Sequence, residues 1–302
     1  MTAMVALDWG TSSLRAARLG SAGEVLEERA TEHGILNVPP QGFPRVFDEV
    51  LDGWTLEPGT LCLASGMVGS RQGWVEAPYH RCPAGLPELA HHVAWVPDAP
   101  RGLRLGIAPG VWQEAHGVPD VMRGEEVQVV GAADLLNLDD GLFVLPGTHS
   151  KWVELRGRRI VDFATYMTGE TYAVLRRHSI LGRTMPGEDG ALDGTAFLKG
   201  VLNAVRGESL LRSAFSARTF ALFSRIPPEG LPSYLSGVVI GEELRAQRLE
   251  NRQVHLVLVG SPALTHRYQL ALRALGVQAT AVGSEATWRG LWVLANRLGA
   301  SE

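Results

Sequence analysis

The first thirty residues alternate between apolar runs and short turns of small or polar residues. Strands are predicted over Met4–Trp9, Leu14–Leu19 and Gly23–Ala30, separated by Gly-Thr-Ser-Ser and by Gly-Ser-Ala-Gly. Because such short turns join antiparallel neighbours, the three strands are predicted to form an antiparallel meander.

Further along, apolar residues recur either at helical spacing or in short runs typical of strands. In the first half, helices are predicted over Pro44–Trp54 and Gly124–Leu136, with strands Thr60–Ala64 and Leu103–Ile107 between them. Helices are also expected after residue 164 and after residue 260. The predicted strands of the second half, followed by a terminal helix, are Leu142–Leu145, Lys151–Leu155, Arg159–Ala164, 254–260 and Val277–Ala281, with the helix at Ser284–Arg297.

The opening pattern returns in the second half of the chain. ALDWGTSSLRAARLGSAGEVLEERAT and FVLPGTHSKWVELRGRRIVDFATY both give strand, Gly-Thr-x-Ser turn, strand, turn, strand. The distance from Gly10 to Gly147 is too long for a solenoid repeat and is typical of a duplicated domain. Two unrelated Gly-Thr turns in a chain with 35 glycines are the alternative.

The Gly-Thr-Ser-Ser turn is suited to binding an anion. Small residues let backbone N–H groups converge, and the hydroxyls of Thr11, Ser12 and Ser13 add donors. Asp8, at the carboxyl end of the first strand, could hold Mg²⁺ directly or through water. Two such turns facing each other across a cleft would grip a polyphosphate, whereas one turn alone would indicate an ordinary polar hairpin. No GxxxxGK[ST] motif occurs and no GxGxxG follows a strand, so any nucleotide is bound by another geometry.

Composition narrows the class of protein. The chain has 302 residues, of which 45% are hydrophobic and 20% charged, and this favours a soluble globular protein of two domains. A net charge of −4 without a basic run argues against nucleic-acid binding. Without a signal peptide or a long apolar stretch, no membrane association and a cytoplasmic location are expected. Cys62 and Cys82 have no partner at metal-ligand spacing and are predicted to be buried thiols.

Five segments in order resemble one family of sugar-acid kinases. They are ALDWGTSSLRAA, SGMVGSRQGWVEAPY, VMRGEEVQVVGA, LPGTHSKWVEL and FATYMTGETYAVLRRHSILGR. With them the chain is similar to the 2-dehydro-3-deoxygalactonokinase family, within the acetate and sugar kinase, Hsp70 and actin superfamily. The resemblance is strong from Ala6 to about Arg183 and looser through VLVGSPALTHRY to the end.

The resemblance implies an α/β fold of two duplicated RNase H-like domains, each a mixed β-sheet flanked by helices, with an interdomain ATP cleft. The N-terminal domain is expected over residues 1–135, with the first phosphate loop and the sugar-acid site. The C-terminal domain is expected over 136–302, with the second phosphate loop and the adenosine segment.

The resemblance also implies which segments bind the nucleotide. LDWGTSS is expected to be the first phosphate loop, LPGTHSK the second, and VLVGSP the adenosine segment. Many superfamily members carry an aspartate on the corresponding strand of the second domain, but Leu145 stands there, which leaves Asp8 as the main metal candidate. The expected nucleotide-binding residues are Gly10, Thr11, Ser12, Ser13, Gly147, Thr148, His149, Ser150, Gly260 and Ser261.

Phosphoryl transfer to a sugar hydroxyl needs an acceptor for the hydroxyl proton, and a carboxylate near the cleft is suited to this. GEEVQVVG resembles the GDxxAAxxG segment that carries the aspartate base in carbohydrate kinases. Its flanking glycines align Glu125 with the base, with Glu126 as the alternative, although both acids could merely complement the dipole of a helix start. Lys151, directly after Gly-Thr-His-Ser, could neutralise transferring charge or be an ordinary strand lysine.

A carboxylate on the substrate would suit an arginine, whose guanidinium binds it in a bidentate manner. Arg71 in SGMVGSRQGW corresponds to an arginine that binds the polyol in related kinases, and Ser70 and Trp74 lie beside it. Arg15 and Arg123 are the other candidates, and each arginine could instead be a solvated surface residue.

YMTGETY, at the start of a predicted helix, supplies a further set of polar residues. Thr168, Gly169 and Glu170 could bind the sugar hydroxyls or the phosphate, but Thr168 could equally cap the helix.

The function implied by the resemblance is ATP- and Mg²⁺-dependent phosphorylation of the 6-hydroxyl of 2-dehydro-3-deoxy-D-galactonate in galactonate catabolism. The partner is expected to be a small sugar acid, and the protein a monomer or homodimer. A kinase for a neutral or anhydro sugar and a non-catalytic nucleotide switch are the alternatives. A carboxylate-binding arginine would favour the acid.

Overall fold

The computed structural model describes residues 3–207, 209–249 and 255–299. By its contacts the chain divides into two compact units. The first unit comprises Met1–Phe143, Val153–Ala164 and Val282–Glu302, and the second comprises Val144–Trp152 and Thr165–Ala281. The expected domains, 1–135 and 136–302, are each one continuous stretch, whereas each unit is assembled from separate segments of the chain. The last segment of the chain belongs to the first unit.

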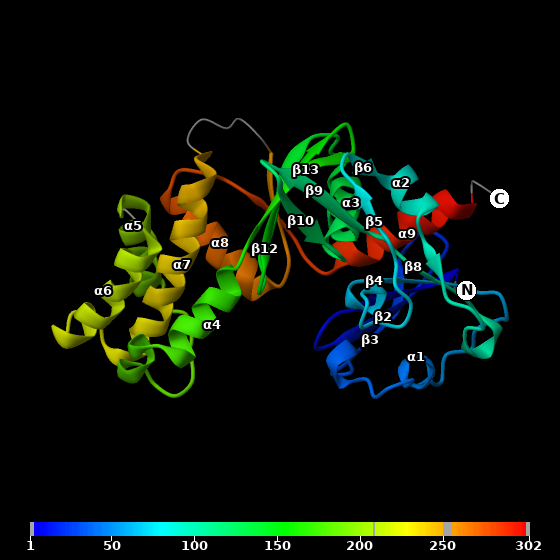
Figure 1. Ribbon diagram of the computed structural model, residues 1–302, viewed down its shortest axis with the longest axis horizontal. Helices are drawn as coiled ribbons and strands as arrows, with labels where there is room; N and C mark the ends of the chain where they lie inside the picture. Colours follow the sequence, from blue (N-terminus) through cyan, green and yellow to red (C-terminus); the bar gives the residue numbers. More distant parts are fainter. Residues whose placement is uncertain (1–2, 208, 250–254, 300–302) are drawn as a thin grey trace. The chain divides into compact units, whose positions relative to one another are not determined.

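Strands and helices are interspersed along the described chain, except that α4 to α7 follow one another with no described strand between them (Figure 1). The strands are β1 (Met4–Trp9), β2 (Leu14–Leu19), β3 (Val25–Thr31), β4 (Leu61–Ser65), β5 (Tyr79–Arg81), β6 (Ala84–Gly85), β7 (Ala94–Trp95), β8 (Arg104–Ile107), β9 (Gly110–Ala115), β10 (Val118–Met122), β11 (Gly141–Leu145), β12 (Ser150–Arg156), β13 (Arg159–Tyr166), β14 (Leu256–Val259) and β15 (Thr280–Val282). The α-helices are α1 (Phe43–Val50), α2 (Leu86–His91), α3 (Glu125–Leu136), α4 (Thr168–His178), α5 (Gly194–Arg206), α6 (Leu210–Leu222), α7 (Leu231–Gln247), α8 (Pro262–Ala274) and α9 (Glu285–Gly299).

Two six-stranded sheets share one strand pattern. Their orders are β3-β2-β1-β4-β8-β7 and β15-β14-β11-β12-β13-β6. In the first, β1–β2 and β2–β3 are antiparallel, whereas β1–β4 and β4–β8 are parallel. In both sheets later strands lie beyond the first strand of a three-strand meander: β4, β8 and β7 beyond β1 in the first sheet, and β14 and β15 beyond β11 in the second. The predicted meanders and the α/β fold of two RNase H-like domains are thereby confirmed.

The core of the first unit lies between the first sheet and α1. Val5, Leu7 and Trp9 of β1 and Phe47 of α1 are fully buried in one cluster. The apolar residues of α1 recur at helical spacing, which gives the helix one apolar face to place on the sheet. In the same unit, α9 packs against α3 and β1.

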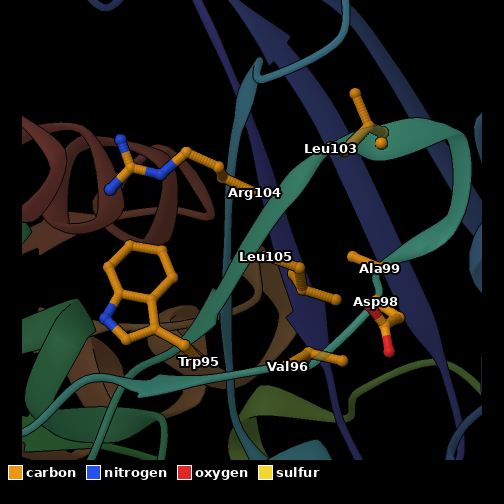
Figure 2. A pocket seen from close by; sticks show the side chains of 8 residues that line it. Trp95, Val96, Asp98, Ala99, Leu103, Arg104 and Leu105 are labelled. Atoms are coloured by element: carbon orange, nitrogen blue, oxygen red, sulfur yellow. The ribbon is translucent and has the colours of Figure 1, made fainter.

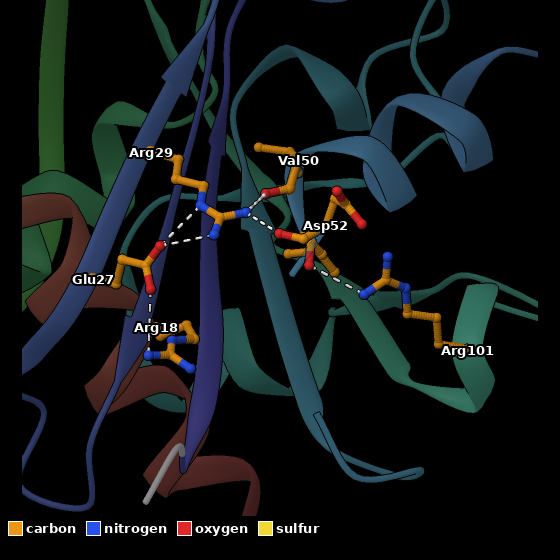
Figure 3. A network of polar contacts seen from close by, with 7 residues as sticks. Arg18, Glu27, Arg29, Val50, Asp52 and Arg101 are labelled. Atoms are coloured by element: carbon orange, nitrogen blue, oxygen red, sulfur yellow. Dashed lines mark hydrogen bonds and ion pairs between the residues drawn. The ribbon is translucent and has the colours of Figure 1, made fainter. Parts of the chain in front are cut away.

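A chain of polar contacts joins the outer strands of the first sheet to the end of α1 (Figure 3). Glu27 of β3 accepts hydrogen bonds from Arg29 at 2.8 Å and pairs with Arg18 of β2 at 3.3 Å. Arg29 also donates to the carbonyl oxygens of Val50, at 3.3 Å, and of Asp52. The guanidinium therefore binds carbonyl groups that the end of the helix leaves without a helical partner.

Most of the predicted elements are confirmed within a few residues, but α1 ends at Val50 rather than at Trp54. Gly53 has φ +74°, a left-handed conformation that a continuing helix cannot accommodate. The strand expected over Val277–Ala281 is shifted to β15, and residue 254 of the strand expected over 254–260 lies outside the described residues.

The helices α5, α6 and α7 pack together within the second unit (Figure 1). Gly200 of α5 faces the carbonyl oxygen of Tyr234, and Gly237 of α7 faces that of Phe197, so closely that a Cβ at either glycine would collide. These glycines allow the two helix backbones to approach. Among the helices that the structure describes, none combines the length and apolar character needed to cross a membrane.

Candidate functional site

The first Gly-Thr turn is a tight, exposed loop after β1. Its ends are closed by a hydrogen bond from the Gly10 N–H to the Ser13 carbonyl at 2.9 Å. Thr11, Ser12 and Ser13 are exposed, and the described residues provide no hydrogen-bond acceptor for their backbone N–H groups. Gly34 packs against the backbone of Ser12 so closely that a Cβ there would collide with it. The loop is therefore supported by Gly34 and keeps backbone donors without a partner among the described residues, as an anion site requires.

Asp8 lies near the end of β1 and forms an ion pair across the meander. Its Oδ2 accepts from the Arg15 Nη2 at 2.5 Å, and the side chains are 20% and 27% exposed. The Arg15 guanidinium also lies 5.3 Å from the ring centre of Trp288. A Cβ on Gly66, which follows β4, would stand 3.7 Å from the Asp8 Oδ1. The carboxylate thus lies where the parallel strands β1 and β4 end.

The start of α3 lies beside the same strand ends. A Cβ on Gly124 would stand 3.1 Å from the Gly66 Cα, and both glycines have positive φ. Glu126 is completely buried and accepts from the Gly124 N–H at 2.8 and 2.9 Å, while the half-buried Glu125 accepts from the Arg123 N–H at 3.1 Å. Burial, and secondly the charge of Glu125, raise the pKa of Glu126 to about 8.

The Arg71 loop is anchored by Trp74. The indole packs 6.2 Å from the Trp9 ring, within the core beneath the first sheet, so Trp74 is a structural anchor here. Arg71 itself is 90% exposed and pairs with Glu76 at 3.2 Å. The Ser70 Oγ accepts a hydrogen bond from a backbone N–H two residues on, at 3.3 Å. The loop therefore presents Arg71 to solvent on a fixed base.

Arg123 is buried behind this loop. Its Nη2 donates to the Ala77 carbonyl at 2.8 Å, and its guanidinium lies 4.1 Å from the ring centre of Tyr79. The Nε and Nη1 groups are buried and have no acceptor among the residues that the structure describes. Two unpaired guanidinium donors at the base of the loop are suited to an anionic oxygen.

The second Gly-Thr turn is held against the start of α4. The Thr148 carbonyl accepts from the Glu170 N–H at 3.0 Å, and the exposed His149 Nε2 lies 2.6 Å from the Glu170 Oε2. A Cβ on Gly169 would stand 2.6 Å from the Gly147 carbonyl oxygen. The second Gly-Thr loop and the start of α4, which are separate segments of the sequence, are thus in contact.

Gly260 and Ser261 lie close to this second loop. A Cβ on Gly260 would stand 3.7 Å from the Pro146 carbonyl oxygen, and the exposed Ser261 directly precedes α8. Helix starts next to a glycine-containing loop favour bound phosphate. Lys151 is buried, and its Nζ donates to the Thr165 Oγ1 at 2.8 Å, so its charge is held close behind the loop.

A buried glutamate that sequence reasoning missed connects these segments. Both oxygens of Glu243 in α7 accept hydrogen bonds: Oε1 from Ser150 (2.8 Å) and Trp152 (2.6 Å), and Oε2 from Tyr268 (2.7 Å) and Thr168. Burial raises the pKa of Glu243, and the four hydrogen bonds oppose that rise. The hydroxyls of Ser150 and Thr168, predicted as ligand donors, are therefore committed to Glu243. The segment GEEL gave no signal, since it is equally typical of a solvent-facing helix.

Among the residues that the structure describes, the acidic side chains suit Mg²⁺ as an ion shared with phosphate. In the described parts of the chain, no three His, Cys, Asp or Glu side chains are grouped so that they could hold a metal. Mg²⁺ is commonly bound by one or two carboxylates together with nucleotide phosphates. Asp8, at the strand ends beside the first loop, satisfies that requirement.

A separate depression of about 470 Å³ lies along β7 and β8 (Figure 2). The Arg104 guanidinium lies over the Trp95 ring, 5.1 Å from its centre, at one side, and Asp98 lies at the other. None of the predicted site residues lines this depression.

Comparison with known proteins gives one consistent relationship. A family model described as 2-keto-3-deoxy-galactonokinase matches residues 8–294. The 2-dehydro-3-deoxygalactonokinase of Escherichia coli (strain K12) is 35% identical over 286 residues, which cover 94% of this chain and 94% of that protein. A crystal structure from Sinorhizobium meliloti, of a protein provisionally named a 2-dehydro-3-deoxygalactonokinase, is 36% identical with a TM-score of 0.89, and the match covers 97% of this chain and 98% of that one.

A more distant structure shares the fold. The activator of 2-hydroxyisocaproyl-CoA dehydratase from Clostridium difficile, solved with ADPNP, has a TM-score of 0.52 at 11% identity, over 100% of this chain and 97% of that one. At that identity the likeness concerns the fold alone. The match to one family over nearly the whole length, and identities above one third, establish that the chain belongs to the 2-keto-3-deoxy-galactonokinase family.

Proposed function

We propose that the chain transfers the γ-phosphoryl group of ATP to the 6-hydroxyl of 2-dehydro-3-deoxy-D-galactonate, a step in galactonate catabolism. The observation that carries this proposal is the family match over residues 8–294, with relatives of that name over most of the chain. The acceptor is a small sugar acid, and nucleic acid and membrane are not partners. We place the reaction in the cytoplasm, where ATP is supplied, and the protein acts as a monomer or homodimer.

Each Gly-Thr loop supplies donors for the nucleotide. The exposed Thr11, Ser12 and Ser13 offer free backbone N–H groups, and the second loop lies beside the start of α4 and beside Gly260. Mg²⁺ would be held by Asp8 together with the phosphates, and when bound it would neutralise phosphate charge. Lys151 adds a positive charge behind the second loop.

Glu125 is the general base of the proposed reaction. As the 6-hydroxyl oxygen forms its bond to the γ-phosphorus, the bond from phosphorus to the ADP oxygen breaks, and the hydroxyl proton passes to the Glu125 carboxylate. Glu125 is half-buried at the start of α3, whose dipole stabilises a negative charge there. The products are the 6-phosphate of the sugar acid and ADP.

Arg71 is the proposed partner of the substrate carboxylate. Its contact with Glu76 is an exposed pair, which a substrate carboxylate can replace at little cost. Arg123 is the second candidate, because two of its buried N–H groups lack an acceptor among the described residues. Arg71 is exposed on the loop whereas Arg123 is buried behind it, so a carboxylate that binds at the surface of the loop meets Arg71 first.

The test is a coupled assay of ADP release with Mg-ATP across 2-keto-3-deoxy sugar acids, their neutral counterparts and no acceptor. Turnover confined to the six-carbon keto-deoxy acids is expected. Turnover on neutral sugars alone would overturn the carboxylate assignment and favour a neutral-sugar kinase. ATP binding without acceptor-dependent turnover would favour a nucleotide switch.

A further inference from the structure

Glu243 accepts hydrogen bonds from side chains of three other elements of the second unit. Ser150 and Trp152 belong to β12, Thr168 begins α4, and Tyr268 lies in α8. Glu243 is 3% exposed, and none of the described Lys, Arg or His side chains forms an ion pair with it. Burying a carboxylate without an opposite charge costs free energy, even when hydrogen bonds stabilise it. An apolar side chain would fill the same space without that cost, so packing alone does not explain Glu243.

The donors stand at the bases of the segments proposed to bind the nucleotide. Ser150 directly follows the second Gly-Thr loop, and Thr168 precedes the Gly169 that touches that loop. Tyr268 lies on α8, the helix that follows Gly260 and Ser261. One carboxylate therefore connects the phosphate loop, the helix start beside it and the adenosine segment.

We propose that Glu243 is a positioning residue for the nucleotide, which holds the second phosphate loop, α4 and α8 in the geometry that binds ATP. This inference rests on the proposed function and adds to it a residue for which sequence gave no signal. Glu243 is buried and both of its oxygens are held by hydrogen bonds, so its loss should act on nucleotide affinity before it acts on the sugar acid.

Glu243→Gln is a sharp probe because it keeps the shape of the side chain. The Trp152 indole N–H can only donate, so the amide oxygen must face Trp152 and Ser150. The amide NH₂ group then faces Thr168 and Tyr268, whose hydroxyls must accept instead of donate. The substitution thus reverses the hydrogen bonds that reach α4 and α8 without opening a cavity.

The neighbouring Glu242 provides a matched control. It lies on the same helix but pairs with Arg245 near the surface, outside the Glu243 contacts. Tyr268→Phe is the milder second variant, since it removes one donor and leaves the carboxylate in place.

The experiment compares full-length wild type, Glu243→Gln, Tyr268→Phe and Glu242→Gln. Calorimetric titration with a non-hydrolysable ATP analogue is combined with the KM for ATP and for the sugar acid. Glu243→Gln is expected to weaken nucleotide binding about tenfold or more, the size of one lost charged hydrogen bond, with the KM for the sugar acid nearly unchanged. Tyr268→Phe should weaken binding less, and Glu242→Gln should match wild type.

Folded Glu243→Gln protein with the nucleotide affinity of Glu242→Gln would overturn the inference, as would an equal rise in both KM values. If Glu243→Gln fails to fold by circular dichroism, Tyr268→Phe decides by the same criterion. Wild type that binds no nucleotide would instead overturn the proposed function, and the inference with it.

Discussion

Glu125 and Glu126 are sequence neighbours that the start of α3 places in different surroundings. Glu126 is fully buried, with a pKa raised to about 8, whereas Glu125 is half-buried at the helix start. A carboxyl group that holds its proton at neutral pH is a poor proton acceptor. The local surroundings therefore favour Glu125 as the base of the proposed reaction.

Glu125→Gln is expected to lower kcat by about 100-fold or more, because the proton acceptor is lost. Glu126→Gln imitates the protonated carboxyl and is expected to keep most of the turnover at neutral pH. Steady-state kinetics of the two variants, prepared side by side, provides the comparison. A larger loss of kcat in Glu126→Gln than in Glu125→Gln would exchange the two assignments.

Glu126 should also make stability depend on pH. Its pKa of about 8 exceeds the ordinary value of 4.5, so between these values the folded protein binds more protons than the unfolded chain. The free energy of unfolding contributed by Glu126 is therefore fully present below the unfolded pKa and is lost as pH rises toward 8, by about 1.4 kcal/mol for each unit of difference. Glu126→Gln cannot ionise, so its stability should improve relative to wild type as pH rises. Urea unfolding of both proteins across this range measures the effect, and a difference that is constant with pH would contradict it.

The positions of candidate site residues in the fold could be predicted only where a residue stands in a local motif. Asp8 and Glu125 adjoin glycine-containing turns, which identify strand ends and helix starts in the sequence. Glu243 lies in an ordinary helical segment, and only the packing of α7 buries it. Trp74 is a different case, because it stands beside Arg71 in the sequence and its ring packs against the core, while its contact with substrate stays a prediction.

At the scale of elements, the second Gly-Thr loop and the start of α4 are in direct contact. Because Gly169 has no side chain, the start of α4 can lie close to the backbone of the loop. A Cβ on Gly169 would stand 2.6 Å from the Gly147 carbonyl oxygen and 2.8 Å from the Thr148 Cα. Because backbone atoms cannot move aside as a flexible side chain can, the loop would have to shift.

Gly169→Ala is expected to raise the KM for ATP about tenfold, since a displaced loop loses part of its contacts with phosphate. Gly194→Ala is the matched control, because Gly194 also lies in the first turn of a helix and a Cβ there meets nothing within 4 Å. The measurement is the KM for ATP of each variant, from kinetics with ATP as the varied substrate. Equal KM values for the two variants would show that the loop position does not depend on Gly169.

Elements with regular apolar patterns were predicted well, and irregular ones were not. Both meanders follow from short apolar runs around Gly-Thr turns, and their shared strand order agrees with duplication. The β9–β10 hairpin was missed, although its His116-Gly117 turn has the two positive φ angles of a tight hairpin. The end of α1 before Gly53, which has a left-handed conformation, is not encoded by the helical pattern of apolar residues.

At the scale of the molecule, the end of the chain completes the first unit. Helix α9 crosses α3 at two glycines, where a Cβ on Gly131 would collide with the Ala286 carbonyl and one on Gly290 with the Val127 carbonyl. The first unit is thus built from segments far apart in the sequence. Periodicity along the chain predicts helices but does not show which of them meet.

Gly290→Ala is therefore expected to destabilise the protein by about 1–3 kcal/mol, as overpacking of a close contact does. Gly299→Ala, in the same helix with nothing within 4 Å of its Cβ, is expected to leave stability nearly unchanged. Thermal unfolding of the two variants measures the difference. The same midpoint for both would contradict a close α3–α9 crossing.

The proposed phosphoryl transfer is best tested by identifying the product of the reaction. Phosphorus NMR of wild type with Mg-ATP and 2-dehydro-3-deoxy-D-galactonate should show loss of the ATP γ-phosphate matched by a phosphomonoester coupled to the protons on carbon 6. Orthophosphate alone, a monoester at another carbon, or unchanged ATP would contradict the proposed phosphoryl transfer.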